Sequence, residues 1–293
     1  MKWIEDLTQT GHSRIFGRFQ WVIYVIVGLC LSIWLTTRSY PSLAQDGSDT
    51  HQNLGLPEFA VHPLPSSLSD WADPNNSGDY FDQVSSAGFG YLIWSEFPVQ
   101  IYLDSEPNET QHFLIEEQEY NWRLAIDDAI QEWNEWIPLE KSNRPEHADI
   151  IIKAQSPPLR WPSSPQLDSD RSSESLSLPR ARTAETTYNI YLAEQGLNPV
   201  VMKQRCTILL SPSQSVSYLK ATARHELGHA LGIWGHSPVQ DDVLYFSQVQ
   251  TPPSISARDI NTLKKIYQQP TQLGWPLASP DESSASASPT DPS

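Results

Sequence analysis

Basic side chains and apolar residues are both scarce in this sequence. Lysine and arginine number 19 against 35 aspartates and glutamates, which gives a net charge of −16. Phosphate binding requires clustered lysine and arginine, so this balance argues against a nucleic-acid partner. Apolar residues make up 39% of the 293 residues, a low fraction for a chain that is folded throughout. Part of the chain is therefore expected to be linker or tail.

Cysteine is equally rare, since Cys30 and Cys206 are the only two. Cys30 lies in an apolar run near the N-terminus, so a folded domain further along the chain would contain a single thiol. A disulfide framework inside that domain is therefore excluded. We expect Cys206 to be a buried thiol in a strand.

The N-terminal apolar run indicates an export signal. It covers residues 21–35, which is shorter than the ~20 residues that a membrane-spanning helix needs. Ser42 and Ala44 have the spacing of a signal-peptidase site, with cleavage after Ala44. We predict a signal peptide over residues 1–44 and a secreted or periplasmic domain. The alternative is an uncleaved signal anchor at residues 16–37, which would be the chain's one attachment to a membrane.

Composition divides the rest of the chain into three parts. Residues 45–87 are rich in Ser, Asp, Pro and Asn without periodicity, which predicts a flexible linker or pro-like segment. Residues 270–293 end in a Ser, Ala, Pro and Asp tract that has too few apolar side chains to offset the entropy of folding, which predicts a disordered tail. Residues 88–269 form the expected domain, which we expect to be monomeric.

Hydrophobic periodicity predicts strands and helices within this domain. Strands are expected at residues 97–103, 148–154, 187–192 and 206–210. Helices are expected at residues 118–137, 217–231 and 256–267. The first helix has Trp122 and Trp133 on its apolar face, which we interpret as core packing. The last helix opens with a capping box at Ser256, and Pro270 prevents its continuation.

The second helix contains two histidines and a glutamate at a spacing that suits a metal. His225 and His229 are four residues apart, so they lie one turn above the other on the same helical face. Two imidazoles placed in this way can bind one metal ion, and Glu226 can reach a water molecule on it. The five-residue pattern at residues 225–229 also occurs by chance in helices, so the residues that follow it determine whether it indicates a metal site.

Those residues supply a third nitrogen ligand. Gly232 comes three residues after His229, and glycine can adopt the left-handed conformation that ends a helix. The chain then turns back, so His236 can approach the same metal from outside the helix. Three neutral imidazoles and a water form a tetrahedral catalytic zinc site. The remaining histidines are interpreted as solvated side chains: His12, His51, His62, His112 and His147.

Residues 225–236, with the sequence His-Glu-Leu-Gly-His-Ala-Leu-Gly-Ile-Trp-Gly-His, resemble the long zinc signature of metzincin peptidases. Within that family the chain looks closest to secreted bacterial matrixin-like proteases. The likeness covers about residues 88–269 and is specific over residues 221–267. It implies an α+β fold with a twisted mixed β-sheet and two long helices, one carrying the zinc motif, followed by a C-terminal helix. It also implies a single catalytic zinc ion.

The resemblance is incomplete at the residue below the metal ligands. Matrixins have a Met-turn there, and this chain has Leu244. In the family this residue forms an apolar floor, and leucine has a similar volume, so the exchange costs under ~1.5 kcal/mol. Phe246 stands where astacin-like enzymes have a zinc-binding tyrosine, which disfavours that subgroup. The sequence has neither a cysteine-switch segment nor the pattern of a structural zinc site, and its scattered aspartates do not allow calcium sites to be inferred.

The sequence therefore predicts a zinc-dependent endopeptidase that acts on a protein or peptide. Glu226 is expected to remove a proton from the attacking water and to deliver it to the leaving amine. The resemblance places the substrate in an extended conformation along an edge strand. Two alternatives stay open. One is a catalytically inactive zinc-binding scaffold, which Leu244 favours and Glu226 disfavours. The other is a membrane-tethered interaction protein with the linker and tail as spacers.

Overall fold

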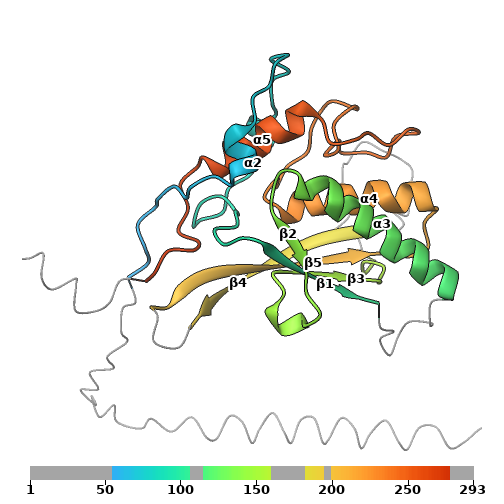
Figure 1. Ribbon diagram of the computed structural model, residues 1–293, viewed down its shortest axis with the longest axis horizontal. Helices are drawn as coiled ribbons and strands as arrows, with labels where there is room; N and C mark the ends of the chain where they lie inside the picture. Colours follow the sequence, from blue (N-terminus) through green and yellow to red (C-terminus); the bar gives the residue numbers. More distant parts are fainter. Residues whose placement is uncertain (1–54, 106–114, 160–181, 195–198, 278–293) are drawn as a thin grey trace, which may run out of the picture. The chain divides into compact units, whose positions relative to one another are not determined.

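The computed structural model describes residues 55–105, 115–159, 182–194 and 199–277 (Figure 1). The predicted signal peptide or anchor lies outside these residues. Among the helices that are described, none is both long enough and apolar enough to cross a membrane.

Five strands form one mixed sheet in the order β2-β1-β3-β5-β4. They are β1 (Val99–Asp104), β2 (Leu139–Lys141), β3 (Ile150–Lys153), β4 (Ala184–Ala193) and β5 (Val201–Leu210). The first four strands in this order run parallel, and β4 pairs antiparallel with β5 at one edge of the sheet. The four predicted strands are confirmed. The three-residue β2 was not predicted, because Glu140 and Lys141 are exposed and give it no apolar alternation.

The described residues contain four α-helices and two 3-10 turns. They are α2 (Ser66–Asp70), α3 (Glu116–Asn134), α4 (Val216–Ala230), α5 (Ala257–Tyr267), η1 (Phe81–Gln83) and η2 (Pro145–His147). Figure 1 shows α3 and α4 side by side on one face of the sheet, and α4 contacts β4 and β5. The three longer helices and the α+β class are confirmed, and so is the capping box of α5. The five-residue α2 is too short to have a recognisable period.

The main core lies between the sheet and helices α3 and α4. Alternate residues of β5 are buried, among them Cys206, whose predicted burial is confirmed. Trp122 and Trp133 of α3 are fully buried. Their indole N–H groups donate to Leu210 O (3.0 Å) and Arg224 O (2.8 Å), so neither leaves an unpaired donor in the core. The prediction of core packing for these tryptophans is confirmed.

A partly buried ion pair links α4 to α3. The Arg224 side chain is 8% exposed, and its Nε and Nη2 atoms donate to the two carboxylate oxygens of Glu132 at 2.5 and 2.7 Å. A third donor, Nη1, bonds to Pro253 O. A planar guanidinium that binds a carboxylate through two parallel bonds restricts both distance and rotation. This pair therefore sets the position of the helix that carries the predicted ligands.

Residues 55–87 differ from the flexible segment that composition predicts. Leu68 and Tyr80 are at most 1% exposed and belong to the same core as the central strands. The Tyr80 N–H also donates to Thr262 Oγ1 of α5, at 3.0 Å. Packing here depends on isolated apolar side chains with no regular spacing, so periodicity gave no signal. The folded unit therefore includes residues from at least 55 onward.

The folded unit also extends further toward the C-terminus than composition predicts. The sequence predicts a disordered tail from residue 270, but Thr271, Leu273 and Leu277 are buried. Ala60 and Thr271 also exchange two backbone hydrogen bonds, at 3.2 and 3.0 Å. The two ends of the described chain thus pair with each other. The Ser- and Pro-rich part of the predicted tail, residues 278–293, lies outside the described residues.

Candidate metal centre

Helix α4 presents two of the predicted ligands on one face. The ring centroids of His225 and His229 lie 4.8 Å apart. Nδ1 of His225 is 2.8 Å from Val243 O, and Nδ1 of His229 is 2.7 Å from Ile233 O. A carbonyl oxygen can only accept, so each Nδ1 carries a proton, which is the single ring proton when the imidazole is neutral. Each Nε2 then has a free lone pair, which is the form that binds a metal.

A tight turn after α4 brings the third ligand back to the helix. The helix ends at Ala230, and Gly232 follows with a φ of +126°, a conformation that favours glycine. Gly235 passes so close to Gln83 that a Cβ on it would lie 2.1 Å from the Gln83 carbonyl oxygen. The two glycines therefore permit both the turn and its close packing on the N-terminal segment. As a result, the ring of His236 returns toward those of the other two histidines.

The three predicted ligands converge. One nitrogen from each of His225, His229 and His236 lies within 4.8 Å of the others. Within the part of the chain that the structure describes, this is the one group of three or more histidine, cysteine or acidic side chains close enough to hold a metal. His236 is the exposed member, and the other two are half-buried. The group can bind a metal ion, and imidazole donors suit transition metals such as zinc.

The surroundings favour the neutral form of His229 and His236. Burial lowers the pKa of His229 to about 3, and the neighbouring His225 contributes in the same direction. Desolvation also lowers the pKa of His236, again with a further effect of His225. Protons compete with a metal for the same nitrogen, so a low pKa removes this competition at neutral pH. Both effects fit a ligand role.

Glu226 lies beside the triad and is held by the edge strand. Its side chain is 8% exposed, and its Oε2 accepts a hydrogen bond from Thr186 Oγ1 of β4 at 2.5 Å. Burial raises the pKa of the Glu226 carboxyl, while His225 and the Thr186 hydroxyl act in the opposite direction. A carboxylate whose pKa is raised toward neutrality is a more effective general base.

The triad and Glu226 lie in an open cleft of about 810 Å³. Its walls come from β4, from the loop after α4 and from the N-terminal segment at Gln83 and Ser85. A second cavity, of about 350 Å³, adjoins the cleft at His225 and Glu226. It is also lined by the side chains of Arg182, Tyr218, Tyr245, Phe246, Val249, Pro252 and Pro253. The site thus combines an exposed groove with a side pocket whose lining is part apolar and part polar.

Leu244 lies against the turn of α4 that separates the two helical ligands. It is fully buried, and its Cδ2 atom would lie 2.6 Å from a Cβ placed on Gly228. Glycine at this position therefore makes room for the leucine. The Leu244 carbonyl oxygen accepts from Ser237 N–H at 2.8 Å. The segment that follows His236 is thus packed and hydrogen-bonded beneath the histidines.

The remaining histidines lie outside this centre. The interpretation of His62 as a solvated side chain is wrong, because its Nε2 is 2.8 Å from Leu273 O and its ring stacks on Trp275 with centroids 4.1 Å apart. His147 is exposed, as expected. The other three, His12, His51 and His112, fall outside the described residues.

Sequence reasoning missed the contribution of β4 to the site. Thr186 reaches Glu226 only because β4 lies at the sheet edge next to α4, 40 residues away in the chain. The carbonyl oxygens of Val243 and Ile233 were missed for a similar reason, because a backbone group carries no sequence signature. The sequence did predict a strand at residues 187–192, which is part of β4. A strand prediction does not give the position of that strand in the sheet.

No protein-family model matches the chain, and no curated protein sequence matches it at a significant level. The chemistry of the site is therefore inferred from its own residues and their arrangement.

Proposed function

We propose that this chain is a zinc-dependent endopeptidase of the metzincin type, similar to the matrixins. The observation that carries the proposal is the convergence of His225, His229 and His236 beside the buried carboxyl of Glu226 in an open cleft. Three neutral imidazoles with a fourth position open to the cleft are the donor set of a catalytic zinc site. When bound there, zinc supplies Lewis-acid chemistry and a more acidic water.

Glu226 is the general base of this proposal. It accepts a proton from the attacking water and later delivers that proton to the leaving amine. Its burial favours the protonated carboxyl, which helps it to hold the proton between these two steps. The Thr186 hydroxyl opposes this effect and fixes the orientation of one carboxylate oxygen. His225 and His229 are held by backbone carbonyls, so they stay oriented as ligands throughout.

Strand β4 is the proposed binding surface for the peptide backbone. It is an edge strand, and its residues Ala184, Glu185 and Thr186 line the cleft. An extended peptide can add to such an edge through main-chain hydrogen bonds. The adjoining cavity of about 350 Å³ then accepts one substrate side chain next to the scissile bond. Its tyrosine, phenylalanine and proline residues, which lie beside the polar Arg182 and Thr222, favour a large side chain with an apolar body.

The proposal extends to the family and the location. The antiparallel edge strand beside the ligand helix and the closing helix α5 support a matrixin-like arrangement. Leu244 departs from the Met-turn methionine, but it is fully buried, as an apolar floor residue would be. The predicted signal at residues 1–44 supports secretion. A protein or peptide substrate and a monomeric enzyme complete the proposal.

The test of this proposal is a peptidase assay with and without a chelator. We expect the purified protein to cleave casein or a quenched fluorescent peptide with a large apolar residue. A chelator should abolish cleavage, and added zinc should restore it, because Glu226 has no activated water to act on without the metal. Full activity in the chelator would contradict zinc catalysis. A protein that binds zinc without cleaving any peptide would instead be the inactive scaffold.

A further inference from the structure

The loop that carries His236 is tied to a buried carboxylate. We call residues 233–245, which follow α4 and the turn at its end, the His236 loop. Ser237, the residue after the ligand, is fully buried and its Oγ donates to Asp242 Oδ2 at 2.5 Å. Ser237 Oγ also accepts from the Val239 N–H at 3.0 Å. The position of His236 on the loop thus depends directly on where the Asp242 carboxylate is held.

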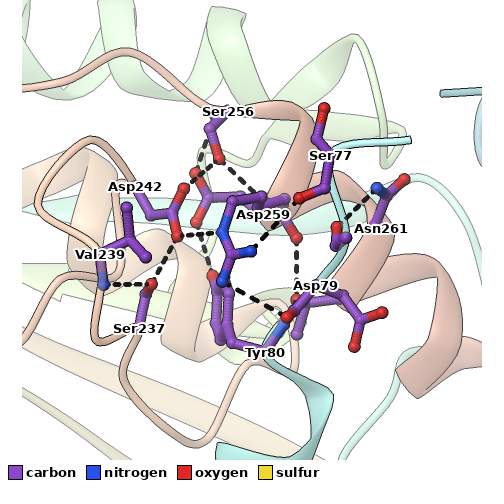
Figure 2. Close-up of polar contacts among 12 residues, drawn as sticks. Ser77, Asp79, Tyr80, Ser237, Val239, Asp242, Ser256, Asp259 and Asn261 are labelled. Atoms are coloured by element: carbon purple, nitrogen blue, oxygen red, sulfur yellow. Dashed lines mark hydrogen bonds and ion pairs between the residues drawn. The ribbon is translucent and has the colours of Figure 1, made fainter. Parts of the chain in front are cut away.

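The Asp242 carboxylate is held from the opposite side by helix α5 (Figure 2). Asp242 is 1% exposed, and besides Ser237 it accepts from Ser256 Oγ at 2.7 Å and from Arg258 Nε at 3.0 Å. Both donors lie at the start of α5. A buried carboxylate without such partners is strongly destabilising, so these bonds offset the cost of its burial and hold it in place. Arg258 supplies the compensating positive charge.

Arg258 also connects the loop to the N-terminal segment. Its Nη1 and Nη2 atoms donate to the carbonyl oxygens of Ser77 and Asp79 at 3.3 and 3.4 Å. Its guanidinium carbon lies 6.0 Å from the ring centroid of Tyr80. One side chain therefore joins three segments that are far apart in the sequence: the N-terminal segment, the His236 loop and α5.

A second carboxylate in the same cluster holds the other end of the loop. Asp259 is fully buried and accepts from Val243 N–H at 3.0 Å. It also accepts from the Tyr80 hydroxyl at 2.5 Å (Figure 2). The carbonyl oxygen of the same Val243 binds Nδ1 of His225. The two neighbouring aspartates thus reach two different members of the triad, Asp259 through Val243 and Asp242 through Ser237.

We propose that Asp242 and Arg258 are positioning residues of the metal centre, which hold the His236 loop so that its imidazole is in place before a metal binds. The inference rests on the metal site proposed above. His236 is the exposed ligand and the one outside α4, so its position depends on a loop. An unrestrained loop would lose conformational entropy at each residue when the metal orders it, and this loss would weaken binding. A loop fixed beforehand avoids that cost.

The experiment measures zinc affinity, by competition with a chromogenic chelator, in the full chain with Asp242→Asn or Ser237→Ala. We expect Asp242→Asn to weaken zinc binding by at least about tenfold, the range for groups that orient metal ligands. Ser237→Ala should weaken it in the same direction by a smaller factor. The matched control is Asp149→Asn, which makes the same carboxylate-to-amide change in a half-buried aspartate that accepts from the Gln100 N–H between β1 and β3, away from the loop and from α4. It should lower the melting temperature and leave zinc affinity unchanged.

The outcomes separate this inference from the proposed function. If the unaltered protein does not bind zinc, the metal site itself is refuted. If it binds zinc and both variants bind it as tightly as the unaltered protein, only the positioning role is refuted, even when their melting temperatures fall as in Asp149→Asn. If Asp242→Asn does not fold, as judged by circular dichroism, Ser237→Ala decides the question. Weaker binding in folded Ser237→Ala supports the proposal.

Discussion

Glu226→Gln is expected to lower kcat on a peptide substrate by about 10²–10⁴-fold, the range that a general base contributes. The amide has nearly the same shape as the carboxylate and can still bond to the Thr186 hydroxyl, so the cleft should keep its form. Glutamine cannot accept the proton of the attacking water, and the loss should therefore appear in kcat. Steady-state kinetics together with zinc analysis of the same sample measures both quantities.

The control for this variant is Glu140→Gln, which neutralises an exposed carboxylate on β2, at the opposite edge of the sheet from β4. It should retain full activity and full zinc content. If Glu226→Gln kept its activity, Glu226 would have no role as a base. If it lost both activity and zinc, the residue would act on the metal site and the assignment of a catalytic role would not stand.

His229→Ala is expected to weaken zinc binding by about 100- to 1000-fold. Structural zinc sites with four ligands bind with about 10–16 kcal/mol, so one ligand accounts for roughly a quarter of this free energy. The variant should also lose the rise in melting temperature that zinc gives the unaltered protein, since a metal that binds only the folded state stabilises it. Chelator competition and thermal melts with and without zinc provide the two measurements.

The matched control is His62→Ala. This histidine is also packed and hydrogen-bonded, to Leu273 O and against Trp275, but it lies outside the triad. Its removal should reduce stability while zinc affinity stays the same. Equal zinc affinities for His229→Ala and the unaltered protein would show that the ion binds elsewhere.

Local signals in the sequence predicted most of the elements and the metal ligands. Spacing alone places His225 and His229 on one helical face, and Gly232 marks the turn that returns His236. These are consequences of helix geometry over twelve residues, so they do not depend on the rest of the fold. The apolar faces of α3 and α4 likewise follow from the spacing of residues within each helix. The predicted ends of both helices lie within three residues of the observed ends.

The contacts that complete the site are not local, and the sequence did not reveal them. Thr186 reaches Glu226 through the order of strands in the sheet, and Arg258 joins segments 181 residues apart in the chain. Composition also misplaced both domain boundaries. Residues 55–87 are polar on average, yet Leu68 and Tyr80 contribute fully buried side chains at irregular spacing. Hydrophobic periodicity detects helices and strands. A segment that packs through single residues has no such periodicity, so its burial gives no signal in the sequence.

The central claim is that three imidazoles hold one metal ion in this cleft. Zinc K-edge X-ray absorption on the unaltered protein, purified without added metal, tests it most directly. We expect one zinc per chain with three histidine nitrogens and one further light-atom ligand at about 2.0–2.1 Å. A protein without bound metal, or a spectrum with fewer than three imidazole ligands, would contradict the account.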